Sequence, residues 1–331
     1  MSKIRKLYYF DKKSTQEMIS FLNNNANDTY INRIMFNPFI PLHHLLPLSL
    51  KFLPESYILK EKKEIKGLIT VAPVKCHIKK IEIQKLFFEE NALEDAAELV
   101  QYVVSKYKAM GAFSIIVKVD DYLTELLHMF TSKCGFTHIS EEKLWRINNF
   151  SKSEYDKKVF RPFRNTDASA VAEIYNNSLL PHFRPLLSIN KNEFLESIFA
   201  GLAYYSEYKY VIEDKNTAQI LACISIRTSD NENYITDIIM SDCANINIDS
   251  VLAFVSDQIH KRKKRFGLFI RTKKYITSGE RTEELLKTKG YEPVQSQIVL
   301  TNSSARVLKN PSEETRYTVF SNFCPSNGIP T

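Results

Sequence analysis

The most constraining feature of this chain is a pattern that occurs twice: an amphipathic helix that ends at a glycine and is followed by an aromatic residue opening a strand. The first copy runs from Glu125 to Phe136, and the second runs from Glu283 to Tyr291. The glycine of each copy, Gly135 or Gly290, stands where the end of a helix favours a left-handed residue. The copies are too far apart for a solenoid repeat, so they predict two similar domains in tandem.

The order of predicted elements repeats around these two copies. In the first half we expect a helix over 14–25, strands over 56–60, 65–73 and 80–88, a helix over 92–110, a strand over 113–119, a helix over 122–133, and strands over 136–139 and 143–147. In the second half we expect helices over 166–180 and 192–202, strands over 208–214, 219–227 and 234–240, a helix over 248–263, a strand over 268–272, a helix over 281–289 and closing strand structure over 291–300. These patterns predict an α/β fold with domains at 1–147 and 159–309, a linker at 148–158 and a loose tail at 310–331.

The composition narrows the kinds of site that the chain can carry. The five cysteines are far apart and form no CxxC pair, so we expect neither a disulfide framework nor a zinc site. The pair His43-His44 has no third ligand at a useful spacing, and we predict no metal. The net charge is +7, and the run from His260 to Arg265 ends a predicted helix, where cations complement the helix dipole. It has no interleaved aromatic residues, so we expect no specific nucleic-acid partner.

The compartment is also an expectation from sequence. No apolar run of 18 or more residues occurs, and the prolines of the apolar segment 36–54 interrupt any long helix there. The segment from Met1 to Tyr9 is basic and has no apolar core before a small-residue cleavage site. We therefore expect no membrane span and a cytoplasmic protein, and the oligomeric state stays open.

With these elements in place, the chain resembles the GNAT superfamily of acyl-CoA-dependent N-acetyltransferases. The features that carry the resemblance are the element order, the Gly135-Phe136 and Gly290-Tyr291 steps, and an Arg-x-x-x-x-x-Asp opening from Arg161 to Asp167. The resemblance covers most of residues 1–305 and implies two tandem GNAT domains, each with a mixed sheet flanked by helices. It implies acetyl-CoA as cofactor and a small-molecule or protein amine as acceptor.

The family holds the cofactor's pyrophosphate with a glycine-containing loop between a strand and a helix, where backbone N–H groups and the helix dipole face the phosphates. None of the eight glycines in this chain lies at either of its two strand–helix junctions. By the resemblance, cofactor-binding residues would lie at those junctions: Phe87, Phe88 and Asn91 in the first half, and Ile239, Met240, Asn245, Asn247 and Ser250 in the second half. Two functions stay open, an N-acetyltransferase and a non-catalytic module that binds a protein or a ligand.

The resemblance also implies catalytic positions. The family often places a tyrosine four residues before the final glycine, to protonate the departing thiolate; here Thr131 and Leu286 stand there, and neither can serve as that acid. A glutamate on a central strand is often the family's general base, and Glu82 is the candidate in this chain. Open strands at the junctions would favour the enzyme, and junctions filled by Phe87, Phe88 or Met240 would favour the binding module.

Overall fold

A computed structural model describes residues 3–8, 11, 14, 24–25, 54–61, 64–74, 77–89, 92–148, 155–156, 159–195, 206–228, 230–242, 244 and 246–303. Several predictions fall outside the described residues. They concern the pair His43-His44, for which no metal is predicted, the candidates Asn91 and Asn245, and the tail 310–331. The helix predicted over 14–25 is wrong at its end, because Asn24–Asn25 form a short strand, β2, against another strand. Most of that predicted helix lies outside the described residues.

The described residues form one mixed sheet with helices on both faces, which confirms the predicted α/β class. The first half contains β1 (Lys3–Lys6), β2 (Asn24–Asn25), β3 (Glu55–Glu61), β4 (Glu64–Val74), β5 (His77–Phe88), α4 (Leu93–Ala109), β6 (Ser114–Asp120), α5 (Thr124–His128), the π-helical turn Met129–Lys133 and β7 (Thr137–Ile147). The second half contains β8 (Phe160–Pro162), α6 (Ala168–Ser178), α7 (Arg184–Leu187), β9 (Ser206–Glu213), β10 (Ile220–Thr228), β11 (Asn233–Met240), α8 (Ile248–His260), β12 (Gly267–Lys273), α9 (Thr277–Thr288) and β13 (Pro293–Ser303).

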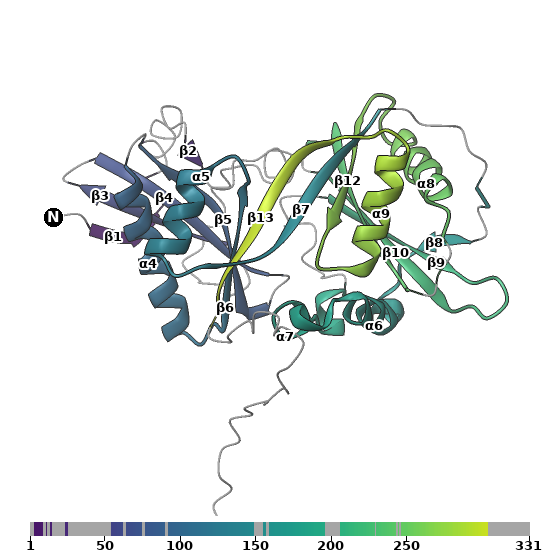
Figure 1. The fold of residues 1–331 in the computed structure, drawn as a ribbon, viewed down its shortest axis with the longest axis horizontal. Helices are drawn as coiled ribbons and strands as arrows, with labels where there is room; N and C mark the ends of the chain where they lie inside the picture. Colours follow the sequence, from purple (N-terminus) through teal and green to yellow (C-terminus); the bar gives the residue numbers. More distant parts are fainter. Residues whose placement is uncertain are drawn as a thin grey trace, which may run out of the picture.

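The last strands of the two halves change places. The strand order through the middle of the sheet is β5-β6-β13-β7-β12-β11, so β13 lies in the first half and β7 lies against the second half. The exchange makes the sheet continuous, and β7 and β13 run side by side across the centre of the molecule (Figure 1). The single tryptophan seals this seam: Trp145 of β7 is fully buried and donates a hydrogen bond from Nε1 to Thr272 Oγ1 of β12 at 2.9 Å.

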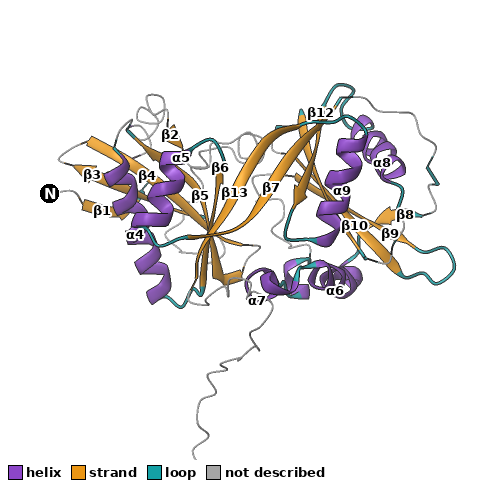
Figure 2. Ribbon diagram, in the orientation of Figure 1, coloured by secondary structure: helices purple, strands orange, loops and turns teal. Residues whose placement is uncertain are grey.

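The helices cover the two faces of the sheet unequally. On one face, α4 and α5 pack over the first half around residues such as Val100 and Ile115, and α8 and α9 pack over the second half around Val255 and Leu286. On the opposite face, α6 and α7 form an apolar cluster with residues from both halves, including Ile116, Val299 and Ile239. Figure 2 shows α6 and α7 side by side at the lower edge of the view, below the central strands.

The structure corrects two predicted element boundaries, one in a strand and one in a helix. The strands expected over 136–139 and 143–147 are one strand, β7, because the polar residues Ser140 to Glu142 pair with β13 and do not form a turn. Helix α9 begins at Thr277 and not at Arg281, since Gly279 lets its first turn pack against the backbone carbonyl of Lys273. Among the helices that the structure describes, none is long and apolar enough to cross a membrane.

Candidate functional site

Each half contains one pair of adjacent parallel strands that separate part-way along their length. In the first half, β5 and β6 pair from Lys80↔Ser114 to Ile83↔Val117, and the rest of β5 runs on without β6. In the second half, β11 and β12 pair from Asn233↔Gly267 to Asp237↔Arg271, and Ile238–Met240 runs on without β12. Ligands of open α/β sheets bind where strands part at their carboxyl ends, so these two points are the candidate sites.

In the first half, the edge that β5 exposes beyond β6 is covered by the chain itself. Strand β2 pairs with it in antiparallel register, Asn24 opposite Phe88 and Asn25 opposite Phe87. Both phenylalanines are buried, Phe88 in the core beneath α4 and Phe87 in a cluster on the other face. The backbone groups that an extended ligand would pair with are therefore already bonded to protein.

The junction that follows β5 is also acidic. The first turn of α4 carries Glu94 and Asp95, and Glu89 precedes it. Burial raises the pKa of Asp95 above its ordinary value, and the nearby carboxylates Glu89 and Glu61 raise it further. Because the carboxylates Glu89, Glu94 and Asp95 outnumber the cations Lys66 and Lys133 that pair with them, a pyrophosphate there would meet electrostatic repulsion.

In the second half, the corresponding edge is open among the described residues. The N–H of Ser241 donates to the carbonyl of Leu221 on the β10 side at 2.9 Å. Because successive N–H groups of a strand point to opposite sides, those of Met240 and Ile238 point toward the side from which β12 has separated. No described strand pairs with Ile238–Met240 on that side. This edge therefore offers backbone donors to a ligand.

The junction after β11 is better suited to an anion than its counterpart after β5. Helix α8 is capped by Asn247, whose side chain accepts the N–H of Asp249 at 2.9 Å. Helix α9 brings two cations to the same junction: Arg281 donates to the carbonyl of Ala244 at 3.1 Å, and Lys289 pairs with Asp249 at 2.6 Å. Lys289 balances Asp249 in the first turn of α8, so Arg281 adds a positive charge at this helix N-terminus, which favours phosphate groups.

The space between the diverging strands β11 and β12 is small in this structure. It holds a cavity of about 10 Å³, bounded by both strands and by Ile276, Ser278, Gly279 and Thr282 at the start of α9. That is room for about one water molecule. An acyl group could enter only if the first turn of α9 moved away from β11.

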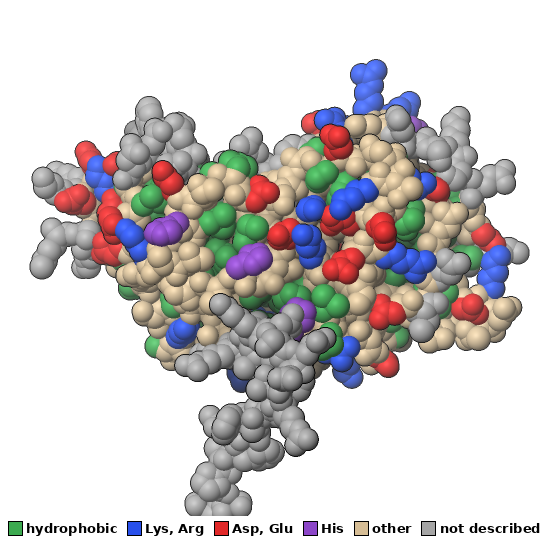
Figure 3. All heavy atoms as spheres, in the orientation of Figure 1, with side chains coloured by type: hydrophobic (Ala, Val, Ile, Leu, Met, Phe, Trp, Pro, Cys, Tyr) green, Lys and Arg blue, Asp and Glu red, His purple; other side chains and the backbone are tan. Residues whose placement is uncertain are grey.

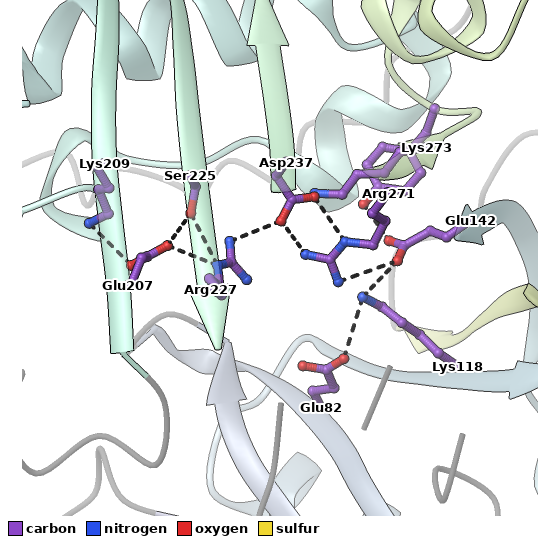
Figure 4. Close-up of polar contacts among 11 residues, drawn as sticks. Glu82, Lys118, Glu142, Glu207, Lys209, Ser225, Arg227, Asp237, Arg271 and Lys273 are labelled. Atoms are coloured by element: carbon purple, nitrogen blue, oxygen red, sulfur yellow. Dashed lines mark hydrogen bonds and ion pairs between the residues drawn. The ribbon is translucent and has the colours of Figure 1, made fainter. Parts of the chain in front are cut away.

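A line of charged side chains crosses the sheet on the face that α6 and α7 cover, and it passes the divergence in the second half (Figure 4). We call it the ionic row, and its signs alternate along nearly its whole length. Its members are Glu207 and Lys209 on β9, Arg227 on β10, Asp237 on β11, Arg271 and Lys273 on β12, Glu142 on β7, Lys118 on β6 and Glu82 on β5.

Asp237 is the centre of the ionic row. Its carboxylate accepts two hydrogen bonds from Arg271, one of them from Nε at 2.8 Å. Arg227 and Lys273 each lie 3.3 Å from its oxygens. Burial acts to raise the pKa of Asp237, but the surrounding cations, Arg271 first, hold it well below its ordinary value. The carboxylate is therefore ionised at neutral pH and is a poor general base.

Glu142 extends the ionic row across the seam between the halves. Its Oε1 accepts a hydrogen bond from Tyr275 at 2.7 Å, and its Oε2 lies 3.1 Å from Lys118 Nζ and 3.8 Å from Arg271. Burial acts to raise the pKa of this fully buried group, and the cations Lys118 and Arg271 lower it to about 2. The ionic row thus ties the two halves together through strands that are neighbours only because of the strand exchange.

Not all candidates chosen from the sequence lie together. Ile239, Met240, Asn247 and Ser250 flank the open edge, Phe87 and Phe88 lie at the closed edge, and Glu82 is the last member of the ionic row, 3.7 Å from Lys118. Leu286 is fully buried, and the hydroxyl of Thr131 donates to the carbonyl of Leu127 at 2.9 Å. Sequence reasoning missed Asp237, Arg271 and Lys273, whose signal was charge inside two otherwise apolar strands.

Metal and surface charge add little to this picture. No group of three or more possible metal ligands occurs among the described residues. On the face drawn in Figure 3, acidic and basic side chains are interspersed, without a large field of one sign.

Comparisons with known proteins identify the architecture. No protein-family model and no curated protein matches the chain. Among solved structures, it is similar to a tandem GNAT protein from the clavulanic acid biosynthesis pathway, solved without acetyl-CoA, with a TM-score of 0.61 and 8% identity over 92% of this chain and 99% of that chain. A GCN5-related N-acetyltransferase from Sphaerobacter thermophilus matches with a TM-score of 0.57 and 9% identity, over 91% of this chain and 95% of that one.

A probable N-acyltransferase from Enterococcus faecalis matches with a TM-score of 0.51 and 7% identity, over 92% of this chain and 72% of that one. Identities this low speak for the fold, and the matches span both halves of the chain. The fold predicted from the repeated helix–glycine–aromatic pattern is confirmed: the chain has the fold of the tandem GNAT acetyltransferases.

Proposed function

We propose that the chain is an N-acyltransferase whose second half binds an acyl-CoA, while its first half binds no cofactor. The observation that carries the proposal is the open edge at Ile238–Met240, set against the closed edge at Phe87 and Phe88. The fold shared with GNAT acetyltransferases supports the acyl-CoA and an amine acceptor, either a small molecule or a protein.

The residues around the open edge suit the parts of an acyl-CoA. The strand edge from Ile238 to Met240 would pair with the extended amide-containing arm. The first turn of α8, with Asn247 and Ser250, would face the pyrophosphate together with Arg281 and Lys289, which replace the missing glycine loop by charge. Asn245 belongs to the same proposed group by its place in the sequence.

When bound, an acyl-CoA supplies a thioester whose carbonyl carbon an amine can attack directly. The chain's contribution would be to position that carbonyl and to stabilise negative charge on its oxygen with the N–H groups of β11, which need no reorganisation at the moment of reaction. A thiol with an ordinary pKa of about 8.5 leaves readily as a thiolate, so Leu286 at the tyrosine position is no barrier to transfer.

A second function is favoured by a separate observation. Both junctions contain buried aromatic or sulfur side chains, since Phe87, Phe88 and Met240 are all buried, and the space between β11 and β12 holds about 10 Å³. A non-catalytic module whose cofactor site has become filled by side chains would have these features. The cytoplasm stays the expected compartment for either function, because Cys134 and Cys223 are buried and the cysteines are far apart in the sequence.

Isothermal titration of the full chain with acetyl-CoA and with CoA at low salt separates the two functions. The acyltransferase predicts binding tighter than about 100 µM, which corresponds to roughly −5.5 kcal/mol. It also predicts release of free thiol when amines are added. No heat of binding, together with a melting temperature unchanged by millimolar acetyl-CoA, would overturn the proposal and leave the binding module.

A further inference from the structure

Lys273 holds a particular position at the open edge of the second half. It is the last residue of β12, two residues beyond Arg271, where pairing with β11 ends. Side chains two apart on a strand share a face, so Lys273 lies on the side of the sheet that α6 and α7 cover, next to Asp237. It also lines the cavity between the diverging strands. An amine therefore already stands beside the space proposed for the thioester.

The amine of Lys273 is held in place but is not sealed off. Its Nζ lies 3.3 Å from Asp237 Oδ1, and its side chain keeps 17% of its exposure. Figure 4 shows the side chain running alongside Arg271 with its nitrogen directed at Asp237. Asp237 does not depend on this contact alone, because Arg271 and Arg227 also pair with it.

Lys273 is the lysine of the ionic row that shares its carboxylate, Asp237, with two arginines. The ionic row has one cation more than it has carboxylates. Asp237 pairs with Lys273 and also with Arg271 and Arg227, and the two arginines cannot lose their protons. Burial lowers the pKa of Lys273 to about 8, against the attraction of Asp237 and with the repulsion of Arg271. A useful fraction of the side chain is therefore a neutral, nucleophilic amine near neutral pH.

We propose that Lys273 is an internal acyl acceptor, which becomes acylated on Nζ by the acyl-CoA bound at the open edge of the second half. The inference rests on the proposed function. The lone pair of neutral Nζ attacks the thioester carbonyl carbon, a C–N bond forms, and the C–S bond breaks with its electrons leaving on sulfur. The proton lost by the nitrogen passes to the thiolate or to solvent, and the products are an amide at Lys273 and free CoA.

Acylation of Lys273 leaves the ionic row balanced. The amide carries no charge, so the remaining cations and carboxylates are equal in number, and Asp237 keeps both arginine partners. The modified side chain would also fill the space beside Ile239 that an external amine would enter. The acylated protein is thus expected to be a stable, self-blocked form.

The test is site-resolved labelling of the full chain with acetyl-CoA, read by mass spectrometry after a digestion that does not depend on lysine. Lys274, the adjacent residue with a side chain 42% exposed, and the exposed Lys264 are the internal comparisons. We expect occupancy at Lys273 at least tenfold above either comparison. A chemical acetylating reagent without CoA should reverse that order, because it follows exposure.

Two matched variants complete the test. Lys273→Arg keeps the charge and should remove most of the CoA-dependent label, whereas Lys274→Arg should keep it. Calorimetry with acetyl-CoA runs alongside on the wild-type chain. If acetyl-CoA binds and Lys273 is labelled no more than Lys274, the inference is overturned and the proposed function stands. If acetyl-CoA does not bind, the proposed function is overturned and the inference falls with it.

Discussion

The two strand divergences have the same topology and different surroundings. At the end of β5 the edge is paired with β2, the nearby phenylalanines are buried, and the next helix begins with carboxylates. At the end of β11 the edge is unpaired among the described residues, and the next helix has one carboxylate in its first turn, Asp249, with Arg281 and Lys289 beside it. Two copies of one fold unit can therefore differ in what they offer to a ligand through one short strand and a few charges, because fold alone does not set function.

The ionic row shows a second difference between the halves. Its second-half members surround Asp237 at 5% side-chain exposure, whereas its first-half end, Lys118 with Glu82, is partly exposed at 22% and 28%. Removing one partner of a buried, multiply bonded ion pair lowers the free energy of unfolding far more than removing one partner of an exposed pair. The following predictions use this contrast and the contrast between the junctions.

The largest effect is expected at the buried end of the ionic row. Arg271→Ala would leave Asp237 without its two hydrogen bonds and Glu142 without one cation, so we expect a loss of about 3–5 kcal/mol in the free energy of unfolding. Urea denaturation measures it. Lys66→Ala, which removes the partly exposed ion pairs with Glu89 and Glu64, is the control and should cost about 1 kcal/mol or less. Equal losses in the two variants would contradict the contrast.

The next effect concerns the two junctions. Reversing both cations of the second half, Arg281→Glu with Lys289→Glu, should weaken acetyl-CoA binding at least tenfold, or about 1.4 kcal/mol. Lys133→Glu, which reverses a cation beside the first-half junction, should leave the binding constant within about twofold. Calorimetry on the variants decides this. Weaker binding in the Lys133 variant alone would place the cofactor in the first half and contradict the proposed site in the second half.

The stability of the protein should also show the unusual environment of Lys273. Its pKa falls to about 8 in the folded state from 10.5, and Asp237, Arg271, Glu142 and Lys118 face it. Well below pH 8 the lysine is protonated in both states. As the pH rises through 8, the folded lysine loses its proton while the unfolded lysine keeps it, so this lysine makes stability rise with pH. Relative to Lys273→Met, the wild type should gain up to about 1.4 kcal/mol per pH unit between pH 8 and 10. Parallel curves for the two proteins would refute this assignment.

The smallest effect is expected at the exposed end of the ionic row. Glu82→Gln breaks one long contact with Lys118 and should cost less than about 1 kcal/mol. Because Glu82 belongs to the half that is proposed to bind no cofactor, thiol release from acetyl-CoA should change by less than about twofold. Glu82 as general base predicts a fall of about 10²- to 10⁴-fold instead, and a fall of that size would restore the first half as a catalytic site.

The repeated helix–glycine–aromatic pattern was sufficient to predict the tandem fold, because each copy is a local signal at the end of a helix. The strand exchange was not predictable from it, since β7 and β13 have the same pattern in whichever half they lie. The buried pairing of Glu142 with Arg271 depends on that exchange. Without the partner strands in view, the polar residues Ser140 to Glu142 had the pattern of a turn. Asn24–Asn25 showed no strand propensity, and their pairing with β5 is a tertiary effect.

The domain division at 1–147 and 159–309 remains a proposal about folding units. The exchanged strands mean that each proposed unit completes the sheet of the other, with β13 against β6 and β7 against β12. Either unit alone would leave exposed the strand edges that the exchange covers. The contrast between the junctions does not depend on where the units are divided.

Hydrogen–deuterium exchange of the full chain with and without acetyl-CoA tests the central claim most directly, because it reports on both junctions in one experiment. We predict slower exchange over 238–251 and 277–289, with no change over 84–100. Slower exchange over 84–100, alone or together with the second-half segments, would contradict the claim that only the second half takes the cofactor.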